Sequence, residues 1–346
     1  MIQIIYAAAL GGLMILLLAF PQAASQGAIQ AMELCFHQLI PALFPFFVVS
    51  SLLVRLPAWS KAAGFLRPLT WAMGIASPQA PLILILSWLG GYGVSAQSIR
   101  EGIRQGSLTP EEGARLLVLG CTSSPGFTIG SVGALMLGSP FLGRLLFVAG
   151  LGANLATGLL LRLILGKAKS RTTIWKPSSV PLNLSSAITE GVSSCLAVCG
   201  SVLFFRVLWQ LAQVLVPLSP TGKAVLGSLL EVTSGCSLMA ALPWPEGCCA
   251  ALSLLGGSVF LQIAGLARGS CSNRLLLLTR PVHLLLSLAF FRIGMHLFPS
   301  ASQVYNSFAP RLILTSRNPP DLAFWLFLLA CLALKTLSGG KRKKSS

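Results

Sequence analysis

Long apolar runs separated by short polar segments cover almost the whole of this chain. Several runs are about 17 to 25 residues long and nearly free of charge, which is what a helix needs to cross the hydrocarbon core of a bilayer. The alternating pattern of barrel strands is missing, so the runs predict helices. We expect an all-α polytopic membrane protein with about eight to ten hydrophobic segments.

The first run, Ile2 to Phe20, predicts an N-terminal transmembrane helix. A cleaved signal peptide is the alternative, but no Lys or Arg precedes the apolar core, which favours an uncleaved helix. The next segment, Ser25 to Gln38, is mixed in polarity and predicts a helix that lies in the interface or packs along the bundle. Its apolar residues at helical spacing are Ala28, Met32, Cys35 and Phe36.

The stretch from Pro81 to Pro125 is the most informative part of the chain. Its first apolar arm ends at Leu89 and is about half a bilayer long, so it predicts a half-helix. Polar residues follow from Ser95 to Arg104, and they would be costly at mid-depth against lipid. Between the two segments lie the breaking residues Gly90, Gly91 and Gly93.

A further helix is predicted within the same stretch. Thr109 is a capping residue, Pro110 suits the first turn, and two glutamates, Glu111 and Glu112, lie near the positive end of the helix dipole. We expect this helix to end at the sequence CTSSPG, which begins at Cys121 and places small hydroxyls beside a second break.

Two short segments suggest an internal repeat. LSWLGG at Leu86 to Gly91 resembles LSLLGG at Leu252 to Gly257, and each lies downstream of an apolar segment that contains Phe-Phe. Broken helices at corresponding positions of two halves are typical of transporters whose site lies at the repeat interface. If both basic segments of the chain are cytoplasmic, an even number of crossings separates them, which predicts a re-entrant segment at Gly256.

The chain is therefore expected to form a single membrane domain over residues 1–346. Its parts are an N-terminal transmembrane helix (1–25), a first Gate-like repeat (26–165), a basic cytoplasmic loop (166–182), a second Gate-like repeat (183–300), and a C-terminal transmembrane helix with a basic tail (301–346).

Composition agrees with a membrane protein and limits the function. Hydrophobic residues make up 54% of the 346 and charged residues 10%, too few charges to cover a water-soluble surface. The net charge is +17, but the basic residues are scattered between apolar segments and gather only at Lys167 to Lys176 and at Lys341 to Lys344, which is typical of cytoplasmic loops rather than of a nucleic-acid interface. The nine cysteines include no CxxC pair, so we expect no disulfide framework, metal site or cofactor.

Longer motifs resemble those of one known family. They are ELCFHQLIPALFPFFVVSSLL (Glu33 to Leu53), GYGVSAQ (Gly91 to Gln97), GSLTPEEGARLL (Gly106 to Leu117), GSVGALMLGSP (Gly130 to Pro140), LLEVTSG (Leu229 to Gly235) and the stretch with Arg280, Pro281 and His283. In this order they resemble the YlbJ-type sporulation integral membrane proteins, which carry the nucleoside-recognition or Gate domain. Two departures, Gly93 for a proline and Thr122 with Ser123 for an asparagine pair, concern the substrate more than the fold.

The resemblance implies a secondary transporter of a small anionic or nucleoside-like solute in the cell membrane. In that family the implied activity is movement of dipicolinic acid across the outer forespore membrane during sporulation. Its implied partners are the lipid bilayer and a small-molecule substrate, with no nucleic acid.

The residues themselves are compatible with an anionic substrate. Helix breaks expose backbone N–H groups and positive helix ends, which favour carboxylates. Arg280 and His283 are three apart and share a helix face, where they are able to pair with a carboxylate of the substrate or of Glu231. We expect the two broken regions to meet near mid-membrane. The candidate substrate-binding residues are Gly90, Gly91, Gly93, Ser95, Gln97, Thr122, Ser123, Ser124, Glu231, Thr233, Ser234, Gly256, Gly257, Gln262, Arg280 and His283.

Other interpretations stay open. The glycines suit close helix packing, and Glu231 suits either a structural ion pair or a coupling site. A nucleoside or ion transporter and a non-transporting Gate-fold scaffold for spore maturation are alternative functions. An intramembrane hydrolase would need a serine of CTSSPG with His283 as its base. No sequence spacing supports that pairing and there is no HExxH motif, so we expect no enzyme.

Overall fold

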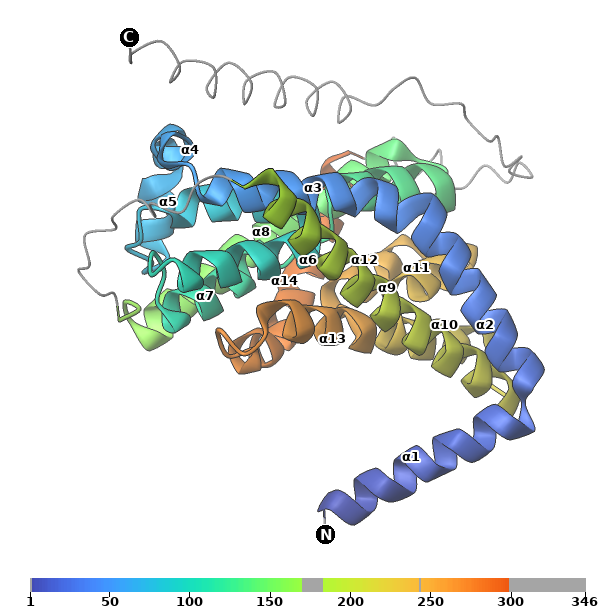
Figure 1. The fold of residues 1–346 in the computed structure, drawn as a ribbon. Coiled ribbons are helices and arrows are strands. Elements are labelled where there is room, and N and C mark those ends of the chain that lie inside the picture. The colour runs from blue at the N-terminus through green and yellow to red at the C-terminus, as the bar shows by residue number, and fades with distance from the viewer. Residues whose placement is uncertain (1, 170–182, 243, 299–346) are drawn as a thin grey trace. The chain divides into compact units, whose positions relative to one another are not determined.

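The computed structural model describes residues 2–169, 183–242 and 244–298. Those residues are arranged in helices, with no strand among them (Figure 1). The chain divides into two compact units, residues 1–308 and 309–346, and all the described helices belong to the first unit. The predicted C-terminal transmembrane helix with its basic tail (301–346) and most of the basic loop lie outside the described residues.

Within the described ranges, five helical segments are long and apolar enough to cross a bilayer. They are α6 (Ala80–Arg104), α8 (Pro140–Leu165), α9 (Leu184–Leu215), the segment Pro245–Ala267 made of α12 (Pro245–Leu254) and α13 (Gly256–Ala267), and α14 (Arg274–Leu297). The prediction of an all-α polytopic membrane protein is confirmed.

Two sharply bent pairs raise the number of spans to seven if each pair crosses once. The first joins α1 (Ile2–Ala19) to α2 (Pro21–Leu34) at 95°, and the second joins α3 (Ile40–Val54) at 90° to the segment containing α4 (Pro57–Ala62) and α5 (Arg67–Ala72). The remaining helices are η1 (Cys35–Leu39), η2 (Ala63–Leu66), α7 (Pro110–Gly120), η3 (Gly126–Met136), α10 (Pro220–Leu230) and α11 (Val232–Ala241).

The helix α2 packs along α9 through its small residues (Figure 1). Gly27 and Ala31 are buried, and a Cβ on Gly27 would lie 3.0 Å from the Cα of Val207. The larger apolar residues Met32 of α2 and Phe36 of the following η1 are 42% and 65% exposed. Of the two predicted arrangements, in the interface or along the bundle, the helix has the second. Its small residues, and not its large apolar ones, face the bundle. This is expected where lipid solvates apolar side chains and close packing holds the helices together.

The predicted break in α6 is present. Gly91 has φ +82° and ψ −168°, a backbone region that is essentially restricted to glycine. A Cβ on this residue would lie 2.9 Å from the backbone nitrogen of Ser124. The break therefore lies directly against the CTSSP link between α7 and η3.

The predicted start of α7 is also confirmed. Thr109 and Glu112 form a reciprocal capping box, in which the Glu112 carboxylate accepts from the Thr109 nitrogen at 3.0 Å. The same carboxylate accepts from the backbone nitrogens of Ala76 and Ser77 at 3.1 and 3.0 Å. One buried glutamate thus caps α7 and fixes the preceding loop.

Most polar residues in the second half of α6 are buried, as their cost in lipid requires, although Arg104 at its end is exposed. Glu101 is 3% exposed and pairs with Arg55 at 3.0 Å and with Arg104 at 2.7 Å. Arg55 also pairs with Glu190 of α9 at 3.1 Å. This network ties α3, α6 and α9 together.

The re-entrant segment differs from the prediction. Gly256 interrupts a continuous candidate span, in which Leu255 and Gly256 have φ angles of +70° and +66°. The helices that fold back on each other are α10 and α11, which meet at Glu231. A Cβ on Gly235 would lie 2.4 Å from the Cα of Ser228, so the two arms are in close contact. The proposed relation between the two halves stays a prediction.

Replacing Glu112 with alanine should lower the melting temperature. Three backbone N–H groups would lose their acceptor, and each unsatisfied buried group costs about 1–3 kcal/mol. Unfolding is measured in detergent with a thiol-reactive fluorophore, which reports exposure of the buried cysteines. Glu33→Ala, at an exposed site on α2, is the control. Equal melting temperatures for the two variants would contradict the capping role.

Gly91→Ala should destabilise the protein far more than Gly200→Ala. Alanine at position 91 meets both a forbidden backbone conformation and the Ser124 nitrogen, at a cost of about 1–3 kcal/mol for the backbone alone. A Cβ on Gly200 meets nothing within 4 Å. The same melting assay compares the variants, and a Gly91→Ala protein as stable as the control would show that the break relaxes freely.

Candidate functional site

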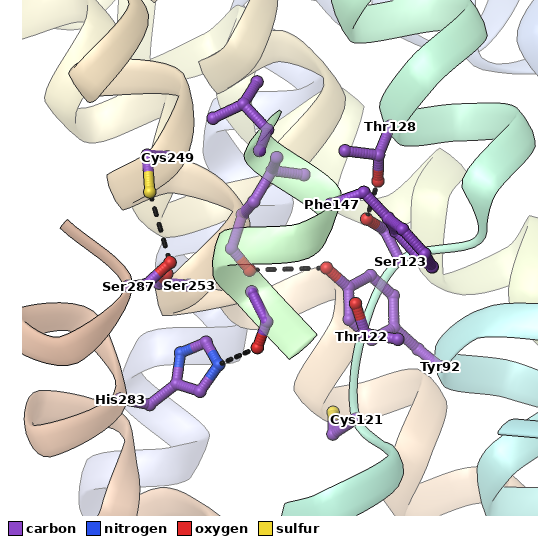
Figure 2. A pocket seen from close by; sticks show the side chains of 13 residues that line it. Tyr92, Cys121, Thr122, Ser123, Thr128, Phe147, Cys249, Ser253, His283 and Ser287 are labelled. Carbon is purple, nitrogen blue, oxygen red and sulfur yellow. Dashed lines mark hydrogen bonds between the residues drawn. The ribbon is translucent and has the colours of Figure 1, made fainter. Parts of the chain in front are cut away.

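A small cavity lies where six segments of the chain meet (Figure 2). Its polar lining comes from Tyr92 of α6, from the link after α7, from Thr128 of η3, and from α12 and α14, while α8 closes it with Phe147 and the Gly150 carbonyl. Its volume is about 20 Å³, which holds roughly one water molecule. The lining includes Tyr92, Thr122, Ser123, Ser253, His283 and Ser287.

One face of α14 carries the charged and polar groups of this region. Arg280, His283 and Ser287 follow one another at helical spacing and are 3%, 4% and 2% exposed. The Nε2 atom of His283 lies 3.4 Å from the Gly150 carbonyl oxygen, and the Ser287 hydroxyl lies 3.2 Å from the Cys249 sulfur (Figure 2). The predicted face of Arg280 and His283 is confirmed and directed inward.

Arg280 is the exceptional member of this face. None of its three guanidinium nitrogens has a hydrogen-bond partner among the described residues, although all three are buried. Arg280 does not itself line the cavity, but its charge interacts with Cys121, Tyr92 and His283, which do. An uncompensated buried charge typically costs several kcal/mol, so the site lacks one negative partner.

Further polar atoms near the middle of α6 and α8 also lack partners within the described part of the chain. An apolar core does not leave such groups unpaired, so their number indicates a region that takes up water or a polar solute. They are Ser95 Oγ, Gln97 Oε1, Ser98 Oγ, Asn154 Oδ1 and Thr157 Oγ1.

The first broken region contributes directly to the cavity. Thr122 and Ser123 line it, and the Ser123 hydroxyl is hydrogen-bonded to Thr128. Ser124 accepts from the Phe127 nitrogen at 3.3 Å and lies against Gly91. The structure therefore brings together the glycine break and the hydroxyl cluster that the sequence placed about thirty residues apart.

The second broken region forms a separate cluster around Glu231. Its carboxylate caps α11 by accepting from the nitrogens of Thr233 and Ser234, both at 2.8 Å, and pairs with Arg206 of α9 at 3.3 Å. Glu231 therefore has a structural ion pair with Arg206 and not with Arg280. Among the two interpretations left open by the sequence, the geometry favours the structural one.

Glycines of this second cluster lie at close helix contacts. A Cβ on Gly256 would lie 2.9 Å from the Ser228 carbonyl oxygen, and one on Gly257 would lie 2.5 Å from the Phe205 ring. Gln262 donates to the Ser258 hydroxyl at 3.1 Å. None of the second cluster lines the small cavity. Tyr92 donates to the Leu252 carbonyl at 3.3 Å, which joins α6 to α12 within the cavity lining.

The remaining predicted site residues on α6 serve contacts within the bundle. Gly93 lies against the Phe47 ring, and Gln97 donates to the Phe47 carbonyl at 3.4 Å. Gly90 lies against the side chain of Val94 in its own helix, and Ser95 is fully buried. Their part in substrate binding stays a prediction.

Several lining residues were not predicted from the sequence. Tyr92, Ser253 and Ser287 escape notice because isolated hydroxyls are common in transmembrane helices. Ser287 follows Arg280 by two helical turns, and this spacing could have predicted that Ser287 shares the inward face of Arg280. Asn154 does not line the cavity, but it could also have been noticed in the sequence, because an amide in the middle of an apolar run needs a partner. Its side chain donates to the Cys121 carbonyl at 3.4 Å.

The cavity does not contain a formed nucleophile and base. Ser123 pairs with Thr128, whereas His283 contacts the Gly150 carbonyl, so the two residues are not hydrogen-bonded to each other. Within the described residues, no group of three or more His, Cys, Asp or Glu side chains is placed to hold a metal ion. No protein-family model, curated protein or solved structure matches the chain.

Arg280→Met should leave the ligand-free protein as stable as the wild type or more stable, because it replaces an unpaired buried charge with an apolar side chain of similar length. Arg206→Met is the matched comparison. It should lower stability by about 1–3 kcal/mol, because it leaves the Glu231 carboxylate without its cation. Melting temperatures in detergent without added anions test the pair. A large loss for Arg280→Met would mean that its guanidinium is satisfied within the protein.

Proposed function

We propose that this protein is a secondary transporter of a small anionic solute, which binds beside Arg280 during its passage. The observation that carries the proposal is the buried guanidinium of Arg280, which has no partner among the described residues. An anion that neutralises it removes the cost of an unpaired buried charge. Ionisable residues within membrane-spanning helices are functional candidates for this reason.

The surroundings of Arg280 support transport. The site is built from the spanning helices α6, α8 and α14 together with helix breaks, an arrangement typical of secondary transporters. A cavity that holds about one water is too small for an organic anion, so the structure corresponds to a closed state. Passage of a solute requires these helices to separate, and the unpaired polar atoms on α6 and α8 would then face a wetted path.

Dipicolinic acid is the substrate that we favour. An arginine fork matches a carboxylate in a bidentate geometry, and the hydroxyls of Thr122 and Ser123 are donors for a second carboxylate. A nucleoside is uncharged and would leave Arg280 without a counter-ion. The resemblance to the YlbJ-type proteins supports the same substrate and, with it, a place in the outer forespore membrane.

Uptake into proteoliposomes tests the function. Wild-type protein should accumulate labelled dipicolinate, whereas Arg280→Met should reduce initial uptake by about 100-fold, the effect of removing one member of a buried charge pair. Arg292→Met is the control, since Arg292 is an exposed arginine on the same helix. Labelled uridine and ferrous ion are measured in parallel.

The outcomes separate the alternatives. Dipicolinate uptake that depends on Arg280 supports the proposal. Uridine or metal uptake that is insensitive to Arg280→Met would contradict it, and uptake of none of the three solutes by folded protein would favour a scaffold.

A further inference from the structure

A second and larger cavity lies away from Arg280, where the end of α6, the beginning of α9 and the end of α13 meet. Its volume is about 550 Å³, within the usual range for a small-molecule site. We call it the arginine vestibule, because its lining includes three arginines. The lining residues are Arg100, Ile103, Arg104, Thr189, Glu190, Ser193, Arg268 and Ser270.

The arginine vestibule carries an excess of positive charge. Three arginines face a single lining carboxylate, that of Glu190. Behind them, Arg55 and Glu101 cancel each other in a buried pair. The net excess of the lining is therefore three minus one, or two positive charges, which a dianion would neutralise.

Two of the arginines are free to bind a ligand. The Glu101 carboxylate is occupied by Arg55 and Arg104, while Glu190 is held by Arg55. Arg100 has no hydrogen bond or ion pair within the described ranges, and Arg268 contacts only the Ser193 hydroxyl, at 3.2 Å. Both arginines line the cavity, and its one lining acid, Glu190, is already paired with Arg55 at 3.1 Å and with Arg104 at 3.5 Å.

The vestibule lies at the end of the helices that is next to the basic loop. Glu190 is in the second turn of α9, which begins just after that loop, and Thr109 beyond the end of α6 donates to the Lys169 carbonyl at 3.0 Å. Loops rich in Lys and Arg mark the cytoplasmic side. A ligand would accordingly reach the vestibule from that side.

We propose that the arginine vestibule binds a doubly charged oxyanion, a phosphate or a dicarboxylate, at a site separate from Arg280. Guanidinium forks suit both chemistries, and neighbouring hydroxyls from Thr189, Ser193 and Ser270 supply further donors. The oxyanion belongs either to a soluble anion or to the phosphate of a lipid headgroup. This inference does not depend on the transport function.

Binding is measured with full-length protein that carries Arg280→Met, so that the interior cavity contributes nothing. One arm titrates inorganic phosphate into protein in detergent by calorimetry, and the other counts bound phosphatidic acid by native mass spectrometry after reconstitution with excess phosphatidylcholine. Arg100→Gln and Arg268→Gln are tested singly. Arg144→Gln, at an exposed arginine on α8, is the control.

Each vestibule variant should weaken binding about tenfold or more, because each removes charged hydrogen bonds. The control should bind as before. Arg268 is exposed, so its variant remains informative if Arg100→Gln melts early.

Loss in the phosphate arm indicates a soluble anion, and loss in the lipid arm alone indicates a headgroup. Absence of binding in both arms, or affinities unchanged by both variants, would overturn the inference. Neither result alters the uptake expected through Arg280.

Discussion

The structure depends on how buried charge is balanced inside a helical membrane protein. Most of its buried ions have partners that also fix helices: Glu101 joins α3 and α6 through Arg55, and Glu231 caps α11 while pairing with Arg206. Arg280 is the exception, as a buried cation whose counter-ion is not among the described residues. An unpaired buried charge is costly, and this cost is the basis for proposing an anionic ligand beside Arg280.

Helix breaks give this charge its surroundings. Gly91 adopts a backbone region that only glycine readily occupies, and this places Tyr92 and the CTSSP link around one cavity. The Gly256 region instead lies against the helix cap and ion pair of Glu231. Both breaks therefore pack against a second break, but only the first one contributes residues to the cavity.

Much of the fold could be predicted from the sequence, because helix signals are local. The capping residue Thr109, the half-helix ending near Gly90 and the break at CTSSPG all lie where the sequence places them. The buried face of α2 was harder to predict from the sequence. In a bilayer, apolar side chains such as that of Phe36, just after α2, gain nothing by turning inward. The partner of Glu231 could not be predicted, since sequence gives no distance between α9 and α11. The lining serines were missed for the same reason, because only the packing of α12 against α14 gives them a shared cavity.

The central claim is that an anion occupies the space beside Arg280. An experimental structure of the protein in lipid nanodiscs with dipicolinate tests it most directly. The account predicts a carboxylate about 2.7–2.9 Å from the Arg280 guanidinium, with the second carboxylate near Thr122 and Ser123 in an enlarged cavity. A guanidinium bound to a protein carboxylate, or a cavity that stays closed and empty at saturating dipicolinate, would contradict it.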